Sequence, residues 1–265
     1  MAQAGAYSLY WFLGDRAHRE RAMEGFEKVL ISGVLFGVAL ILVNLSLWGL
    51  NIFISLAGVP GHSAIKALNQ TKSWQDFGSR VQAALEIAER TYDGYRQAAW
   101  SILAGYAALV AGFGVLPWTS AVSMAVMNAF AFVATAATTV LISAAVYAIA
   151  AAMAKTWPAL LPLGAVLVAY ERTRNLGSWL LALSVVAPVV LAAGADVLAS
   201  RVDALRLLTS IPLAGAPLSP PWLQVDPRPL LEAMVILGLI GLALSTLSYA
   251  ASRLFDHAGA HLSLD

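Results

Sequence analysis

The side chains that carry chemistry in most enzymes are few in this sequence, and they form no familiar catalytic pattern. Its four histidines are His18, His62, His257 and His261, and only the last two are four residues apart. A zinc site takes three or four ligands, so this pair alone does not predict one. The sequence contains no HExxH zinc motif, no GxSxG nucleophile turn and no GxxxxGK[ST] phosphate loop. We therefore predict a protein that is not an enzyme and carries no metal or cofactor.

Charged residues inside the apolar segments are equally sparse. A charge there would point to an ion or proton pathway, and Asp196 is the only candidate. Because Arg201 follows five residues later, we expect Asp196 at the end of a helix, near the membrane interface, rather than in a relay. The amides of Asn44, Asn51 and Asn128 need partners in hydrocarbon, where a bond between helices is worth about 0.6 to 2 kcal/mol.

The composition decides the class of protein. The chain has 265 residues, of which 60% are hydrophobic and only 12% charged, and its mean hydropathy is +0.74. Residues 97–154 include no acidic residue, no basic residue and no histidine. Since about 20 apolar residues cross a bilayer, this run has room for two spans and a turn. We predict an integral protein of the plasma membrane that crosses the bilayer several times.

The predicted fold is an all-α, polytopic bundle of about six spans, with five to seven as the range, and one amphipathic helix outside the hydrocarbon. Tyr7, Tyr10, Trp11 and Phe12 are expected to anchor the N-terminal segment at the headgroups. The predicted regions are an interfacial segment at 1–28, a first span at 29–59, a polar loop with the amphipathic helix at 60–97, spans two to five at 98–206, a proline-rich loop at 207–230, and the last span with a short tail at 231–265.

The amphipathic helix is predicted at 73–96, after a capping-box pattern that starts at Ser73. Its large apolar residues recur at steps of three and four, which places them on one face. Glu86 and Arg90 are spaced four apart in the favourable acid-first order. The apolar face is expected either to lie on the membrane surface or to pack against another protein.

Small and hydroxyl residues form ridges along two of the predicted spans. Ala131, Thr135, Thr139 and Ser143 follow one another at steps of four, and the first span carries a Gly33-x-x-x-Gly37 pair on the face of Asn44 and Asn51. In lipid, helices associate through close packing and hydrogen bonds, which such residues allow. The ridges therefore pack the chain's own bundle, join copies or partner subunits, or line an aqueous path.

The order of these parts resembles a known family. An amphipathic N-terminal region runs into GFEKVLISGVLFGVALILVN, and a polar helix and spans rich in Ala, Gly, Ser and Thr follow. This layout is similar to the TrbL-like membrane components of type IV secretion and conjugation systems, and in length to their archaeal DNA-import relative, CedA. The resemblance covers most of the chain in order and texture, but no signature motif carries individual residue roles across.

The resemblance implies a non-enzymatic subunit of a translocation complex that forms or supports a path through the membrane. Its partners would be the lipid bilayer, further copies or other membrane subunits, and a separate ATPase, with single-stranded DNA as a candidate cargo. The formal net charge of +1 gives no independent support for a nucleic acid. The alternative is a small-solute transporter or permease subunit, which would need a polar site at the midplane.

Overall fold

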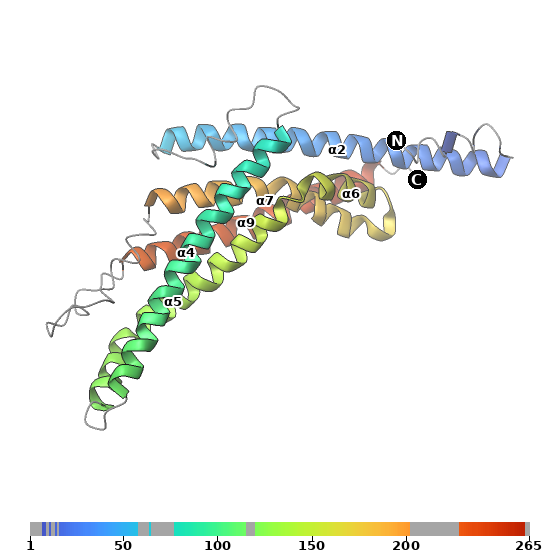
Figure 1. The fold of residues 1–265 in the computed structure, drawn as a ribbon. Coiled ribbons are helices and arrows are strands. Elements are labelled where there is room, and N and C mark those ends of the chain that lie inside the picture. The colour runs from blue at the N-terminus through green and yellow to red at the C-terminus, as the bar shows by residue number, and fades with distance from the viewer. Residues whose placement is uncertain are drawn as a thin grey trace. The chain divides into compact units, whose positions relative to one another are not determined.

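The computed structural model describes residues 7, 8, 11, 14, 16–57, 64, 77–114, 120–201 and 228–262, without the side chains of 46–57 and of most of 112–130. Its elements are α2 (Arg16–Ala57), α4 (Phe77–Gly114), α5 (Ser120–Ala154), α6 (Trp157–Val168), the 3-10 turn η3 (Glu171–Thr173), α7 (Arg174–Arg201) and α9 (Arg228–Leu262). No strand occurs in these ranges (Figure 1). The predicted all-α class is therefore confirmed.

Four stretches of these helices are long and apolar enough to cross a membrane. They are Arg16–Leu45, Ala131–Ala154, Glu171–Arg201 and Arg228–Ala260. A chain with four such helices is a membrane protein by length and composition, as predicted. The proline-rich loop predicted at 207–230 lies outside the described residues except for its last three, which already belong to α9.

The fourth predicted span, expected at 158–170, corresponds to α6, which is too short to cross a bilayer by itself. α6 has 12 residues, which rise about 18 Å, whereas the hydrocarbon layer is about 30 Å thick. It begins after Thr156 with a proline in its first turn, Pro158, and it contains a second proline, Pro162. Because proline cannot donate a backbone hydrogen bond, this sequence favours a short helix.

Three boundaries differ from the prediction because helices continue through polar sequence. α2 begins at Arg16 instead of at residue 29, so residues 16–28 of the predicted interfacial segment are helical and continuous with the first span. α4 joins the polar helix and the predicted second span without a break. α9 extends to Leu262, so the tail with His257 is helical. Arg, Glu, Ala and Lys, which are common in these extensions, favour helix and do not interrupt it.

The chain divides into two compact units. The first contains Met1–Phe53, Met153–Val190 and Ala243–Asp265, and the second contains Ile54–Ala152 and Leu191–Leu242. The helices α2, α5, α7 and α9 contribute residues to both units. The contacts within each unit are described separately.

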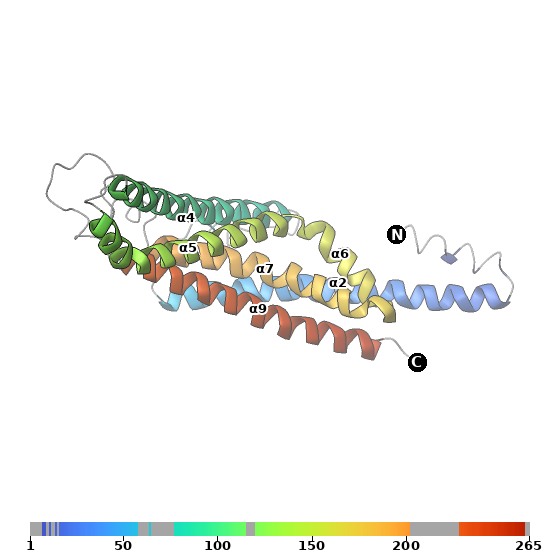
Figure 2. The ribbon, with the colours of Figure 1, turned by 90° about the horizontal axis from the view of Figure 1, so that it is seen from below.

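In the first unit, glycines bring α6 close to α7. Figures 1 and 2 show α6 beside the first part of α7. A methyl group added at Gly164 would lie 2.9 Å from the backbone nitrogen of Leu181, and one at Gly177 would collide with the backbone of Val168. Val168 also meets Gly259 of α9. The two backbones can approach this closely only because these α6 and α7 positions have no side chain.

The N-terminal aromatic residues are partly described. The ring of Tyr7 lies 6.2 Å from that of Phe26 on α2, and Tyr7 packs over Gly25. Trp11 is exposed, which is compatible with the predicted anchor at the headgroups. Tyr10 and Phe12 lie outside the described residues.

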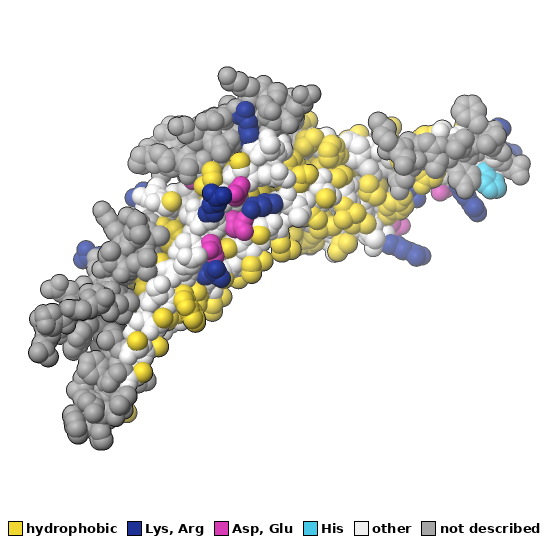
Figure 3. All heavy atoms as spheres, viewed as in Figure 1, with side chains coloured by type: hydrophobic (Ala, Val, Ile, Leu, Met, Phe, Trp, Pro, Cys, Tyr) yellow, Lys and Arg dark blue, Asp and Glu magenta, His cyan; other side chains and the backbone are white. Residues whose placement is uncertain are grey.

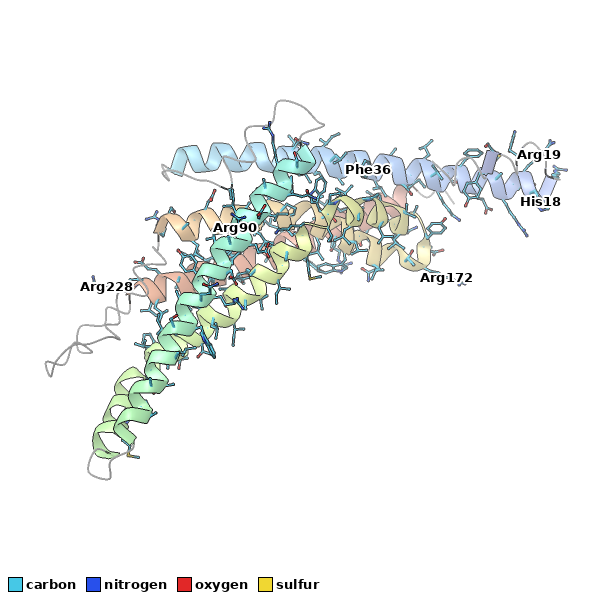
Figure 4. All side chains as sticks on the ribbon, in the orientation of Figure 1. His18, Arg19, Phe36, Arg90, Arg172 and Arg228 are labelled. Carbon is cyan, nitrogen blue, oxygen red and sulfur yellow. The ribbon has the colours of Figure 1, made fainter. Side chains whose placement is uncertain are left out.

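The predicted apolar face of the amphipathic helix is buried in the second unit. Its buried members are Val81, Ala84, Leu85, Ala88, Tyr92 and Tyr95. The opposite face of α4 is polar, and Figure 3 shows acidic and basic side chains gathered on it. The predicted Glu86–Arg90 ion pair is present there, with Arg90 labelled in Figure 4. This face was expected to meet lipid or another protein, but Tyr92 and Tyr95 instead bond to this chain's own α7.

We expect Gly177→Ala to destabilise the protein. The added methyl group meets backbone atoms, which cannot rotate away, and overpacking of this kind costs about 1 to 3 kcal/mol. The measurement is the free energy of unfolding in detergent by SDS titration. Gly94→Ala on α4 is the matched control, because nothing lies within 4 Å of its added methyl group, and it should be neutral or stabilising by up to about 1 kcal/mol. Equal stability of both variants would contradict the α6–α7 contact.

Candidate functional site

The glycine pair of the first span lies on an open face of α2. A methyl group added at Gly33 or Gly37 would meet nothing within 4 Å among the described residues. On the same helix, the Asn44 side chain donates a hydrogen bond to the Leu40 carbonyl at 2.9 Å. Its amide is thus satisfied by its own helix in the first unit, and no bond to another helix is seen. The side chain of Asn51 lies outside the described residues.

The ridge predicted on the third span also faces outward. Ala131, Thr135 and Thr139 are exposed, and Ser143 is half-buried. Thr135 donates to the Ala131 carbonyl at 2.8 Å, and Thr139 donates to the Thr135 carbonyl at 3.0 Å. The hydroxyls are therefore satisfied within α5. Three of the four ridge positions are thus exposed in the described structure, and the role of the ridge in packing the bundle, joining copies or lining a path stays a prediction.

The predicted site residues are not gathered into one site within either unit. Gly33, Gly37 and Asn44 belong to the first unit, whereas Asn128 and the α5 ridge belong to the second. Asn128 is exposed. Their common property is that they lie on outer helix faces, where another helix could approach closely.

The second unit instead contains a buried cluster of tyrosines. The Tyr92 hydroxyl donates to the Leu191 carbonyl at 2.9 Å, and the rings of Tyr92 and Tyr147 lie 5.7 Å apart. Tyr147 in turn donates to the Leu237 carbonyl on α9 at 2.8 Å. Gly194 leaves the space, because a methyl group there would lie 2.8 Å from the Tyr92 oxygen. The cluster thus links α4, α5, α7 and α9.

Asp196 completes this cluster from α7. Its side chain is only 4% exposed, and its Oδ1 accepts a hydrogen bond from the backbone N–H of Ala64 at 3.0 Å. Asp196 was expected at an interface, but its carboxylate lies inside the packing and bonds to the backbone of Ala64. Burial raises the pKa of Tyr92, and the neighbouring Tyr147 and Asp196 raise it further. The Tyr92 phenol therefore remains protonated and continues to donate at neutral pH.

The cluster holds helices together and offers no exposed reactive group. Its hydroxyls are engaged with backbone carbonyls of neighbouring helices. In the described ranges, no three His, Asp or Glu residues come together as metal ligands. Tyr92 and Tyr95 belong to the apolar face predicted for the amphipathic helix, but the sequence did not predict that this face is buried within the chain, nor what their hydroxyls bond. The available signal was the i, i+3 spacing of the two tyrosines, together with Asp196 as the single acidic residue in a predicted span.

Comparisons with known proteins add no identification. A scan against protein-family models, a search of curated proteins and a search of solved structures each found no match. The function is therefore inferred from the residues described above.

We expect Asp196→Ala to cost about 1 to 3 kcal/mol of stability, because it leaves the Ala64 N–H buried without this acceptor. Asp196→Asn keeps an oxygen at the same place and should cost clearly less. The measurement is the free energy of unfolding in detergent for both variants beside the wild type. If Asp196→Ala and Asp196→Asn have the same free energy of unfolding, the Asp196 carboxylate does not hold Ala64.

Proposed function

We propose that the chain is a non-enzymatic membrane subunit of a macromolecule translocation complex in the plasma membrane, where it forms or supports the path through the bilayer. The observation that supports the proposal is that small residues occupy open or exposed positions on helices of the described part of the chain. Gly33 and Gly37 meet nothing within 4 Å in the described structure, and Thr135 and Thr139 are exposed.

In a bilayer these faces would meet either lipid or a second helix, and the two surroundings differ in free energy. Glycine costs a helix interior roughly 1 kcal/mol relative to alanine, and a face that meets only lipid has no compensation for this cost. Contact with a second helix compensates, because small residues let two backbones approach and gain close packing. These faces therefore favour contact with other subunits over contact with lipid alone.

Other glycines of this chain lie against close neighbours, and they can be compared with Gly33 and Gly37. At Gly164, Gly177 and Gly194, close neighbours inside the chain occupy the space that a side chain would need. Gly238 on α9 is also open, so an open glycine alone does not predict a partner. α2 differs because its two open glycines, Gly33 and Gly37, lie one turn apart on the same face, which favours close approach of another helix.

The partners and cargo follow from the family resemblance. A separate ATPase would supply energy, since the sequence has no phosphate-binding loop, and single-stranded DNA is the proposed cargo. The charged face of α4, with Glu86, Arg90, Asp93 and Arg96, is a candidate surface for such a soluble partner. A permease is the alternative, and it would need a polar site at the midplane, for which Asn44 and Asn128 are the described candidates.

We expect the double variant Gly33→Leu/Gly37→Leu to break an assembly while the subunit stays folded. Leucine at both positions prevents close approach of another helix, and its Cβ would have no described atom of this chain within 4 Å. The measurement is particle mass in mild detergent by light scattering, with circular dichroism to report helicity. Gly238→Leu on α9 is the matched control, since its face is also open, and it should leave the mass unchanged.

Two results would count against the proposal. One is a wild type that is monomeric and recovers no membrane or ATPase partner after crosslinking in membranes. The other is normal DNA transfer in host cells from which the gene has been deleted. If the protein assembles with partners but DNA transfer is normal without the gene, the assembly is retained and the permease alternative is favoured.

A further inference from the structure

An ordered arginine lies at the end of the last candidate span. In α9, the Nε and Nη2 atoms of Arg253 donate to the hydroxyl of Tyr249 at 3.2 and 3.1 Å, and its guanidinium carbon lies 5.3 Å from the centroid of that ring. The Tyr249 ring in turn lies 6.4 Å from Trp179 on α7. All three residues belong to the first unit, so their contacts form one local surface.

The charge pattern places this surface at the edge of the hydrocarbon. Residues 233–252 of α9 carry no charge, with Glu232 before them and Arg253 after them. These 20 residues rise about 30 Å, which matches the hydrocarbon thickness. On α7, the uncharged stretch begins just after Arg174, and Trp179 follows within about two turns. Tryptophan and tyrosine are enriched at this depth in membrane proteins.

The surface is open and has donors to spare. Trp179 is 38% and Tyr249 52% exposed, and Arg253 is exposed. A guanidinium has five N–H donors, and Tyr249 takes two of them, so three remain within the described structure. Because Tyr249 holds the planar group in place, little side-chain freedom is lost when a second acceptor binds.

The acceptor that matches this chemistry at this depth is a phosphate. Guanidinium groups bind phosphate oxygens through two parallel hydrogen bonds, and the phosphates of the bilayer lie just outside the hydrocarbon. Leu183, one turn deeper on α7 than Trp179, is 40% exposed and offers an apolar track for an acyl chain. Asp256 lies one turn beyond Arg253 on α9, so the ligand must be held by directed bonds more than by net charge.

We propose that Arg253, Tyr249 and Trp179 form a binding site for one anionic phospholipid, in which the Arg253 guanidinium binds the lipid phosphate and the Trp179 and Tyr249 rings flank its glycerol region. A zwitterionic lipid brings its own ammonium, which competes with the guanidinium for the phosphate. The site therefore prefers a lipid whose headgroup carries a net negative charge. This inference is independent of any role in translocation.

The test is lipid binding to the purified protein in mild detergent, measured by native mass spectrometry during titration with phosphatidylglycerol or phosphatidylcholine. The wild type should bind phosphatidylglycerol more tightly. Arg253→Ala removes two charge-assisted bonds and should weaken that binding about tenfold or more. Tyr249→Phe keeps the ring against Trp179 but releases the guanidinium, and it should weaken binding by about threefold.

Arg172→Ala is the matched control. Arg172 is exposed on the turn between α6 and α7 and points away from the helices (Figure 4), so the variant makes the same change in charge in the same unit. It should alter phosphatidylglycerol affinity less than twofold. Equal losses in Arg172→Ala and Arg253→Ala would show diffuse attraction and overturn the site, as would unchanged affinity in Arg253→Ala with normal helicity. Displacement of the lipid by equimolar inorganic phosphate would assign the site to a soluble anion instead.

Discussion

The burial of α7 is the constraint on which the packing of the other helices depends. About two thirds (67%) of its most apolar window is buried, against 22% in each of the other three candidate spans. In a bilayer, apolar surface alone does not bring helices together, so a central helix has to offer close packing and hydrogen bonds. α7 offers both, through glycines that admit neighbouring backbones and through carbonyls that accept tyrosine hydroxyls.

This constraint separates two kinds of small residue that look alike in sequence. Gly177 and Gly194 are surrounded because a neighbouring helix or side chain needs their space. Gly33 and Gly37 are open, and the threonines of the α5 ridge satisfy their hydroxyls within their own helix. The first kind stabilises the chain itself. The second kind leaves open, closely approachable faces, and the proposed subunit role is based on them.

Polar groups are distributed by the same physical rule. Inside the helix packing, Asp196 has the Ala64 N–H as a partner, and Tyr92 has a carbonyl. At the ends of the spans, Arg253 lies against Tyr249, where an aromatic ring and a guanidinium can both meet headgroups. On the outer face of α4, opposite charges pair with each other along the helix. An unsatisfied polar group is costly in hydrocarbon, so each environment selects its own partner.

Composition and periodicity were enough to predict an all-α membrane protein, the apolar face of α4 and the Glu86–Arg90 pair. These features depend on residues that are neighbours along one helix, and local spacing is visible in a sequence. The continuity of α2 and α4 was missed because a change from polar to apolar composition does not by itself break a helix. Only the tertiary structure decided that Asp196 meets Ala64, that Tyr92 bonds to α7, and that the α5 ridge faces outward, because each depends on which helices become neighbours in space.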